Sequence, residues 1–192
     1  MSRNIAYGGS GIIKRGNQKM PRIMFCGDAH LGHKNIHNYR TDFATAEEHH
    51  EIIYDNIRSS VNKRDTLIMM GDTAFTHAWL RKVGEIPAKK KILIAGNHCT
   101  ENGINMRHLV AEYDEVHAAL SFRNYWLTHI PMHPQELRGR RGNIHGHLHG
   151  NNVWIDWESK GRDQMEVMDN RYINTCLEHC DWKPVSWEEL GA

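Results

Sequence analysis

The first half of the chain contains three short apolar runs, each of which ends in a glycine followed by polar side chains. The runs are RIMFCGDAH at 22–30, DTLIMMGDTAF at 65–75 and KKILIAGNHC at 90–99. Short apolar runs closed by glycine are typical of buried strands whose carboxyl ends open into loops. The pattern therefore predicts three buried strands that deliver polar side chains at their carboxyl ends.

Helical patterns separate or follow these runs. Segment 45–61 opens with the capping-box pair Thr45 and Glu48, and one of its faces carries Ile52, Ile53, Ile57 and Val61. In this helix we expect His49 and His50 to face solvent. Two further helices are expected over 77–84 and 105–113. The alternation of strand and helix predicts a parallel sheet covered by helices.

The second half of the chain is dominated by strand-like segments, at 116–122, 124–130, 143–149 and from Tyr172 onward. Between them, 151–171 indicates a β-hairpin, and Ser186 with Glu189 predicts a short capped helix at the end. At 192 residues the chain fits one domain. We expect a polar tail over 1–20 and a single α/β domain over 21–192.

Composition narrows the class of protein. Hydrophobic residues make up 40% and charged residues 24%, with a formal net charge of +1. No apolar run approaches the roughly 20 residues of a membrane span, and the start lacks the apolar core of a secretory signal. The four cysteines form no paired CxxC clusters, which favours reduced thiols and a cytoplasmic protein. The net charge does not indicate a nucleic-acid coat protein, although local patches leave nucleic-acid binding open.

The chain has 15 histidines, and several follow the strand-like runs. Ligand-type residues at these strand ends converge at one edge of an open α/β sheet, and they are Asp28, His30, Asp72, Asn97, His98, His129, His147 and His149. Because residues two apart in an extended segment share a face, His147 and His149 are expected to reach one site together. The glycines around them let the backbone approach closely.

Apart from His98, this set offers two carboxylates, one amide oxygen and four imidazoles, and no thiolate. Such donors suit Mn²⁺, Fe²⁺, Zn²⁺ or Ni²⁺. Seven ligands are too many for one tetrahedral ion but suit two ions that share a carboxylate. A centre of that kind keeps a positive charge and attracts a phosphate anion, so a phosphate ester is the expected substrate.

The ordered blocks GDAH, GDTA, GNHC, LTHIP and HGHLHG resemble the five signature blocks of the calcineurin-like metallophosphoesterase superfamily. The segment DAHLGHKNIHNYR is similar to a small single-domain branch found in bacteria and their phages. The resemblance runs from about Arg22 to Leu190. It implies a four-layer α/β/β/α sandwich, with mixed sheets flanked by helices, and a hydrolase with two divalent ions, of which manganese is the favoured choice.

The resemblance also implies a role for each matching residue. The first ion would be held by Asp28, His30, Asp72 and His149, and the second by Asp72, Asn97, His129 and His147, with Asp72 as the bridge. His98 would donate a proton to the leaving group after a metal-bridging hydroxide attacks phosphorus. This chain departs from the family pattern at Cys99, where an acidic residue is usual. The block GDTAFTH also argues against a protein phosphatase.

The sequence is compatible with three functions. The first is a phosphodiesterase acting on a nucleotide-type substrate, the second a phosphomonoesterase acting on a small metabolite or nucleotide, and the third a catalytically silent metal-binding scaffold. Candidate substrate contacts are His33 and the arginines of RGRR, namely Arg138, Arg140 and Arg141, although solvated loops are an alternative for all four. His145 is left outside the ligand set.

Overall fold

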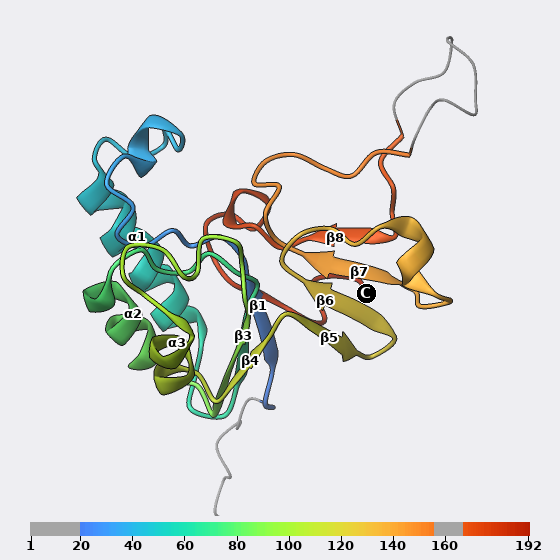
Figure 1. Ribbon diagram of the computed structural model, residues 1–192, viewed down its shortest axis with the longest axis horizontal. Helices are drawn as coiled ribbons and strands as arrows, with labels where there is room; N and C mark the ends of the chain where they lie inside the picture. The colour runs from blue at the N-terminus through green and yellow to red at the C-terminus, as the bar shows by residue number, and fades with distance from the viewer. Residues whose placement is uncertain (1–19, 156–166) are drawn as a thin grey trace, which may run out of the picture.

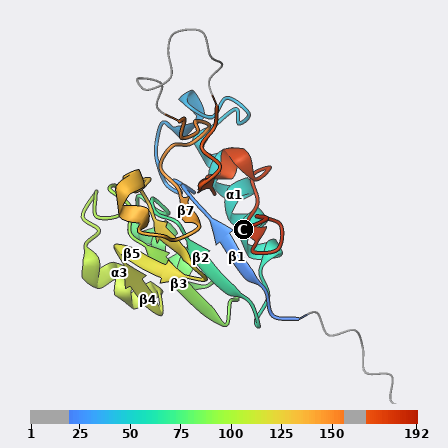
Figure 2. The same ribbon diagram turned by 90° about the vertical axis from the view of Figure 1, so that its right-hand side faces the viewer.

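The computed structural model describes residues 20–155 and 167–192, and most of the predicted tail over 1–20 lies outside this range. The described chain forms one layer of helices and two layers of β-sheet (Figure 1). The parallel sheet predicted from the first half is confirmed. It contains β1 (Ile23–Cys26), β2 (Thr66–Met69), β3 (Lys90–Ile94) and β4 (Glu115–His117) in parallel, with β9 (Val185–Ser186) antiparallel to β1. Figure 2 shows the common direction of β1, β2 and β3.

The second sheet comes from the second half of the chain. It contains β5 (Ala119–Phe122), β6 (Tyr125–Thr128), β7 (Gly142–His145) and β8 (Tyr172–Asn174), in that order. The pair β5 and β6 is antiparallel and the other two pairs are parallel. The strand predicted over 116–122 is therefore two strands, because β4 joins the first sheet and β5 the second. Both sheets are mixed, which establishes a mixed α/β fold.

The helices α1 (Ala46–Ser60), α2 (His77–Gly84) and α3 (Met106–Glu112) follow the predicted spans and pack on the first sheet, on the side away from the second (Figure 1). Among the described residues, no α-helix covers the outer side of the second sheet, where the chain forms only the 3₁₀ turn η2 (Pro134–Leu137). The described part of the fold therefore has three main layers rather than the four expected. None of the helices in the described segments is long and apolar enough to cross a bilayer.

Alternation along the strands of the first sheet creates two cores. Met24, Met69 and Leu93 face the helices, whereas Phe25 and Ile68 face the second sheet. Side chains on successive positions of a strand point to opposite faces, so a run with no polar residue fills both cores at once. This burial fixes the strand ends from which the candidate ligands extend.

Two local predictions need correction, and a third is supported in the part that the structure describes. His49 and His50 are buried, at 0% and 6% exposure, because they point under the loop that follows β1, and Ile52 is instead 41% exposed. After β9 the chain forms turns rather than the expected helix, although the Ser186 hydroxyl does accept a hydrogen bond from the Glu189 amide. Of the predicted hairpin over 151–171, antiparallel contacts at its base are present, while 156–166 lie outside the described residues.

Candidate metal centre

The candidate ligands lie in the loops that follow β1, β2, β3, β6 and β7. Hydrogen bonds between these loops join the two halves of the chain. The His30 amide donates to the Asp72 carbonyl at 2.9 Å, and the His147 amide donates to Asp28 Oδ2 at 2.8 Å. The Gly146 amide also donates to the His129 carbonyl at 3.0 Å. One edge of the sandwich thus gathers residues from 28 to 149.

Five of the seven candidate ligands have left-handed backbone conformations. Their φ values lie between 43° and 69°, at Asp28, His30, Asp72, His147 and His149. Such conformations are uncommon for residues other than glycine, and strained residues cluster at functional sites. They also correct the extended geometry expected for 147 and 149, because β7 ends at His145. Both imidazoles nevertheless reach the common edge.

Two glycines make room for the carboxylates. A Cβ atom at Gly146 would stand 2.5 Å from Asp28 Oδ2, and one at Gly96 would stand 2.2 Å from Asp72 Oδ1. Real Cβ atoms do not approach oxygen this closely, and Asp28 and Asp72 are 0% and 2% exposed, so neither has space to withdraw. The absence of side chains at these two positions is therefore a condition for the arrangement of the acids.

The nitrogen and oxygen donor atoms form two groups whose members all lie within 4.8 Å of one another. We call Asp28, His30 and His149 the His149 group, and Asp28, Asp72 and His129 the His129 group. Asn97 and His147 flank the second group. Asn97 Oδ1 accepts a hydrogen bond from His129 Nε2 at 3.0 Å, and the His147 ring centroid lies 5.1 Å from that of His129. The seven predicted ligands are thus brought together, with Asp28 common to both groups.

The His129 group is deeply buried. His129 Nδ1 donates a hydrogen bond to the Met70 carbonyl at 2.8 Å, which directs Nε2 toward Asp72 Oδ2 at 3.1 Å. Metal-binding histidines usually donate their second ring N–H to such an acceptor, because the hydrogen bond fixes the tautomer and the ring orientation. His129 therefore presents Nε2 as a ligand atom.

The His149 group is more open. His149 Nδ1 lies 2.9 Å from Glu178 Oε1, while its Nε2 lies 3.8 Å from Asp28 Oδ1. The His149 side chain is 41% exposed. His30 Nε2 lies 3.4 Å from the same Asp28 oxygen. As in the His129 group, an acceptor fixes the second ring nitrogen of a candidate ligand. Here the nitrogen is His149 Nδ1 and the acceptor is the Glu178 carboxylate.

The electrostatics of the site favour cations. Burial alone would raise the pKa of Asp28, but the hydrogen bond from His30 and the nearby His129 outweigh burial and hold that pKa well below its usual range. Asp72 follows the same pattern: burial opposes and the His129 hydrogen bond lowers its pKa. Both carboxylates are therefore ionised at neutral pH. Despite its burial, the contact with Asp72 raises the pKa of His129, so protons compete with a metal ion for this ring more strongly than for an ordinary histidine.

His98 lies beside the ligands without joining either donor group. Its amide donates to Asp72 Oδ1 at 2.9 Å, and its ring Nδ1 lies 2.7 Å from Glu101 Oε1. The side chain is 42% exposed. Cys99, which stands where the resemblance leads us to expect an acid, is 2% exposed, and burial raises the pKa of its thiol to about 11. A neutral thiol thus lies behind Asp72, while Glu101 supplies a carboxylate to His98.

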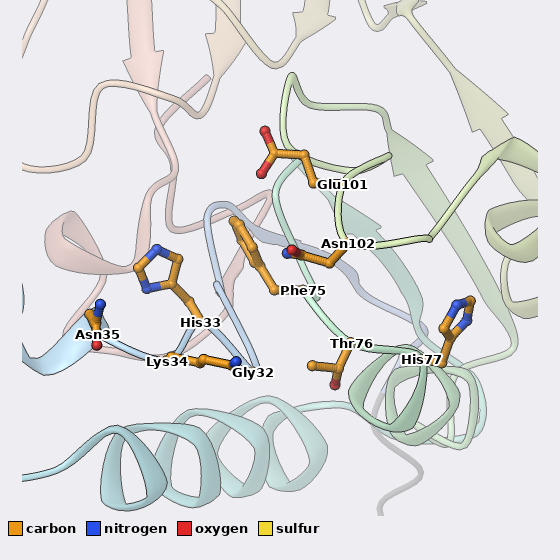
Figure 3. Close-up of a pocket in the computed structure, with 9 residues that line it drawn as sticks. All are labelled: Gly32, His33, Lys34, Asn35, Phe75, Thr76, His77, Glu101 and Asn102. Atoms are coloured by element: carbon orange, nitrogen blue, oxygen red, sulfur yellow. The ribbon is translucent and has the colours of Figure 1, made fainter.

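Three pockets border the centre. The largest, of about 570 Å³, lies over His30, His98 and His149 and extends to Ile36 and Tyr39. A second of about 520 Å³ adjoins it at His33, and Figure 3 shows its polar lining together with Phe75. The third, of about 400 Å³, lies at Asn97 and His129.

The other predicted substrate contacts fall in different places. His33 lines two of the pockets, as a contact residue would. Arg140 and Arg141 precede β7, at the end of the strand opposite the centre, where their guanidinium groups lie over the Trp126 and Tyr125 rings. Arg138 pairs with Glu136 at 2.8 Å. The structure therefore does not bring these arginines to the ligands. His145, buried at 1%, bonds the Gly146 carbonyl and belongs to neither donor group.

Sequence reasoning missed four residues that surround the ligands. Arg40, Glu101 and Glu178 contact them or His98 directly, and the Cys176 thiol donates to Asp28 Oδ2 at 3.2 Å. Arg40 closes the segment DAHLGHKNIHNYR, and Glu101 follows His98 by three positions, so both were within reach of a local search. Glu178 and Cys176 come from the distant C-terminal segment and carried no local signal.

No family model matches this chain, and no curated protein matches it. Among solved structures, the chain is similar to the protein AQ665 from Aquifex aeolicus, which is described as a protein of unknown function. The two are 24% identical with a TM-score of 0.62, over 90% of this chain and 98% of the other. This likeness supports the mixed α/β fold and carries no statement about activity.

Proposed function

We propose that this chain is a calcineurin-like metallophosphoesterase that hydrolyses phosphodiesters with two divalent ions. The observation that carries the proposal is the pair of donor groups around Asp28, built on strained loops and bordered by His98. The donor set is oxygen and imidazole nitrogen, which suits Mn²⁺, Fe²⁺, Zn²⁺ or Ni²⁺, and we propose Mn²⁺ on the resemblance to the metallophosphoesterases. Bound ions would stabilise the phosphoryl oxygens and lower the pKa of a bound water molecule.

The residues of this chain divide the remaining work. Asp28, Asp72, Asn97 and the four histidines would hold the ions, with Asp72 proposed as the shared ligand. His98 lies at the side of the largest pocket, and Glu101 orients its ring by holding Nδ1. This leaves Nε2 of His98 to give a proton to the departing oxygen, a step typically worth about 10²–10⁴-fold in rate.

The pockets favour a diester over a monoester. Space lies beside each donor group, with one pocket at His98 and His149 and a separate pocket at Asn97 and His129. A phosphodiester carries a substituent on each side of phosphorus and needs both spaces, whereas a monoester needs one. The exposed Tyr39 ring at the larger pocket suits an aromatic group such as a nucleobase. We therefore propose a nucleotide-type substrate.

The test is hydrolysis of bis-p-nitrophenyl phosphate beside p-nitrophenyl phosphate by the purified protein reconstituted with Mn²⁺, with EDTA as the control. We expect turnover that EDTA abolishes and that strongly prefers the diester. A preference for the monoester would favour the phosphomonoesterase reading. Two bound ions without any turnover would favour a metal-binding scaffold and overturn the proposed activity.

A further inference from the structure

A buried arginine connects the His149 group to the interior. Arg40 is 3% exposed and lies just after the 3₁₀ turn η1 (Ile36–Asn38). Its Nη2 donates to the Asp28 carbonyl at 2.6 Å, its Nε donates to Glu178 Oε1 at 2.9 Å, and its Nη1 lies 2.8 Å from His49 Nε2. Since burial and the charge of Arg40 lower the pKa of His49 to about 2, that imidazole is a neutral acceptor. All three nitrogens of the guanidinium are thus engaged.

Glu178 links Arg40 to the candidate ligand His149. The oxygen that accepts from Arg40 also lies 2.9 Å from His149 Nδ1. Among the described residues, the other neighbour of that ring nitrogen is Arg40 Nη2 at 3.5 Å, which is a donor and cannot accept its proton. The His149 side chain is more exposed than those of His30 and His129, and Glu178 orients its ring.

Glu178 also has an electrostatic effect. Arg40 places a permanent positive charge beside the position that a divalent ion would occupy in the His149 group. Glu178 Oε1 forms an ion pair with the Arg40 guanidinium at 2.9 Å. Its negative charge offsets the arginine at close range. Without Glu178, an uncompensated buried cation would face the metal ion.

We infer that Arg40 and Glu178 are positioning residues that set the metal affinity of the His149 group and leave the ion at the His129 group independent. This inference rests on the proposed two-metal centre. The independence follows from the anchors, because His129 is held by the Met70 carbonyl and makes no contact with Glu178 among the described residues. Glu178 and Arg40 act through the His149 ring, which belongs to the His149 group alone.

The experiment is a Mn²⁺ titration of the metal-free full-length protein, with free Mn²⁺ followed by electron paramagnetic resonance. Glu178→Gln keeps the size of the side chain and removes its charge, and we expect it to weaken one of two ions by about 10–100-fold. The second affinity should stay within about threefold of wild type. Glu178→Asp, which keeps the charge, should recover part of the loss, and Arg40→Lys should weaken the same ion as Glu178→Gln.

Reference variants identify which ion is affected. The Glu178→Gln titration should match that of His149→Ala and differ from that of His129→Ala. As a matched control, Asp169→Asn removes another well-buried carboxylate that pairs with an arginine, Arg171, and it should leave both affinities unchanged.

Each other outcome overturns the inference in a distinguishable way. Wild-type affinities in Glu178→Gln would refute the positioning role while leaving the centre intact, and an equal loss of both ions would refute its selectivity. A wild-type protein that binds no Mn²⁺ would refute the centre itself. Two bound ions without phosphodiester turnover would refute the proposed function alone, since the titration does not depend on catalysis.

Discussion

The two donor groups share Asp28, but the protein holds them in different ways. The His129 side chain is 2% exposed and is anchored to a backbone carbonyl inside the sandwich. The His149 side chain is 41% exposed and is anchored to a carboxylate that a buried arginine holds. A backbone anchor cannot change without moving a strand, whereas a side-chain anchor can be altered by one substitution. The buried position is therefore fixed by the fold, and the open position depends on the charges behind it.

The largest expected effect is the loss of metal ions from both donor groups. Asp72→Ala should abolish binding of both ions, because Asp72 is the proposed shared ligand and its Oδ2 lies 3.1 Å from His129 Nε2. Metal content after dialysis checks this, with Asp55→Ala on the exposed side of α1 as the control. Retention of one ion per chain would instead make Asp28, which belongs to both donor groups, the shared ligand.

The second prediction concerns His98, the proposed proton donor beside the more exposed His149 group. His98→Ala should lower turnover of a diester with a poor leaving group by about 10²–10⁴-fold, because the departing oxygen loses its proton donor. Both ions should stay bound, since His98 belongs to neither donor group. Glu101→Gln, which only weakens the contact that orients the His98 ring, should lower turnover less. An unchanged rate for His98→Ala with the poor leaving group would remove His98 from this role.

The third prediction compares the two anchors through stability. In EDTA, His129→Ala should lower the free energy of unfolding by about 1–3 kcal/mol more than His149→Ala, because it leaves buried partners without a hydrogen bond. Those partners are the Met70 carbonyl and the Oδ2 atom of Asp72. Urea unfolding followed by circular dichroism measures the difference. Equal losses for the two variants would show that burial does not distinguish the groups.

Sequence reasoning succeeded where the signal is local. The runs at 22–30, 65–75 and 90–99 gave three parallel strands, and the three helices expected over 45–61, 77–84 and 105–113 begin and end within a residue of those bounds. The seven candidate ligands, which the structure brings together, were identified for the same reason, because each lies in a loop that follows a strand. A short apolar run followed by a ligand-type residue can be recognised in the sequence without any knowledge of distant contacts.

Features that depend on long-range packing escaped the sequence analysis. The break that sends β4 and β5 to different sheets has no local marker, and the left-handed turns after β7 contradict the simple extension of an alternating pattern. His49 looked like a surface position because a histidine in a polar helix usually is one. Its partner Arg40, nine residues earlier, becomes visible only once the chain has folded.

The smallest expected effect is a change in the pH dependence of stability, caused by His49, which contacts Arg40 behind the His149 group. His49 is buried and its pKa is lowered to about 2 by burial and by Arg40, against an ordinary value of 6.5. Between these two values the unfolded chain binds a proton that the folded chain does not, so this group lowers stability as pH falls below about 6.5. The slope from this one group is at most about 1.4 kcal/mol per pH unit.

His49→Gln can still accept a hydrogen bond from Arg40 but cannot take up a proton. We therefore expect its free energy of unfolding, measured by urea in EDTA between pH 6.5 and pH 5, to fall less steeply than that of wild type. His133→Gln, at an exposed position far along the chain, should keep the wild-type slope. If His49→Gln also keeps that slope, then His49 is not the neutral acceptor for Arg40, and the charge behind the His149 group has a different neighbour at low pH.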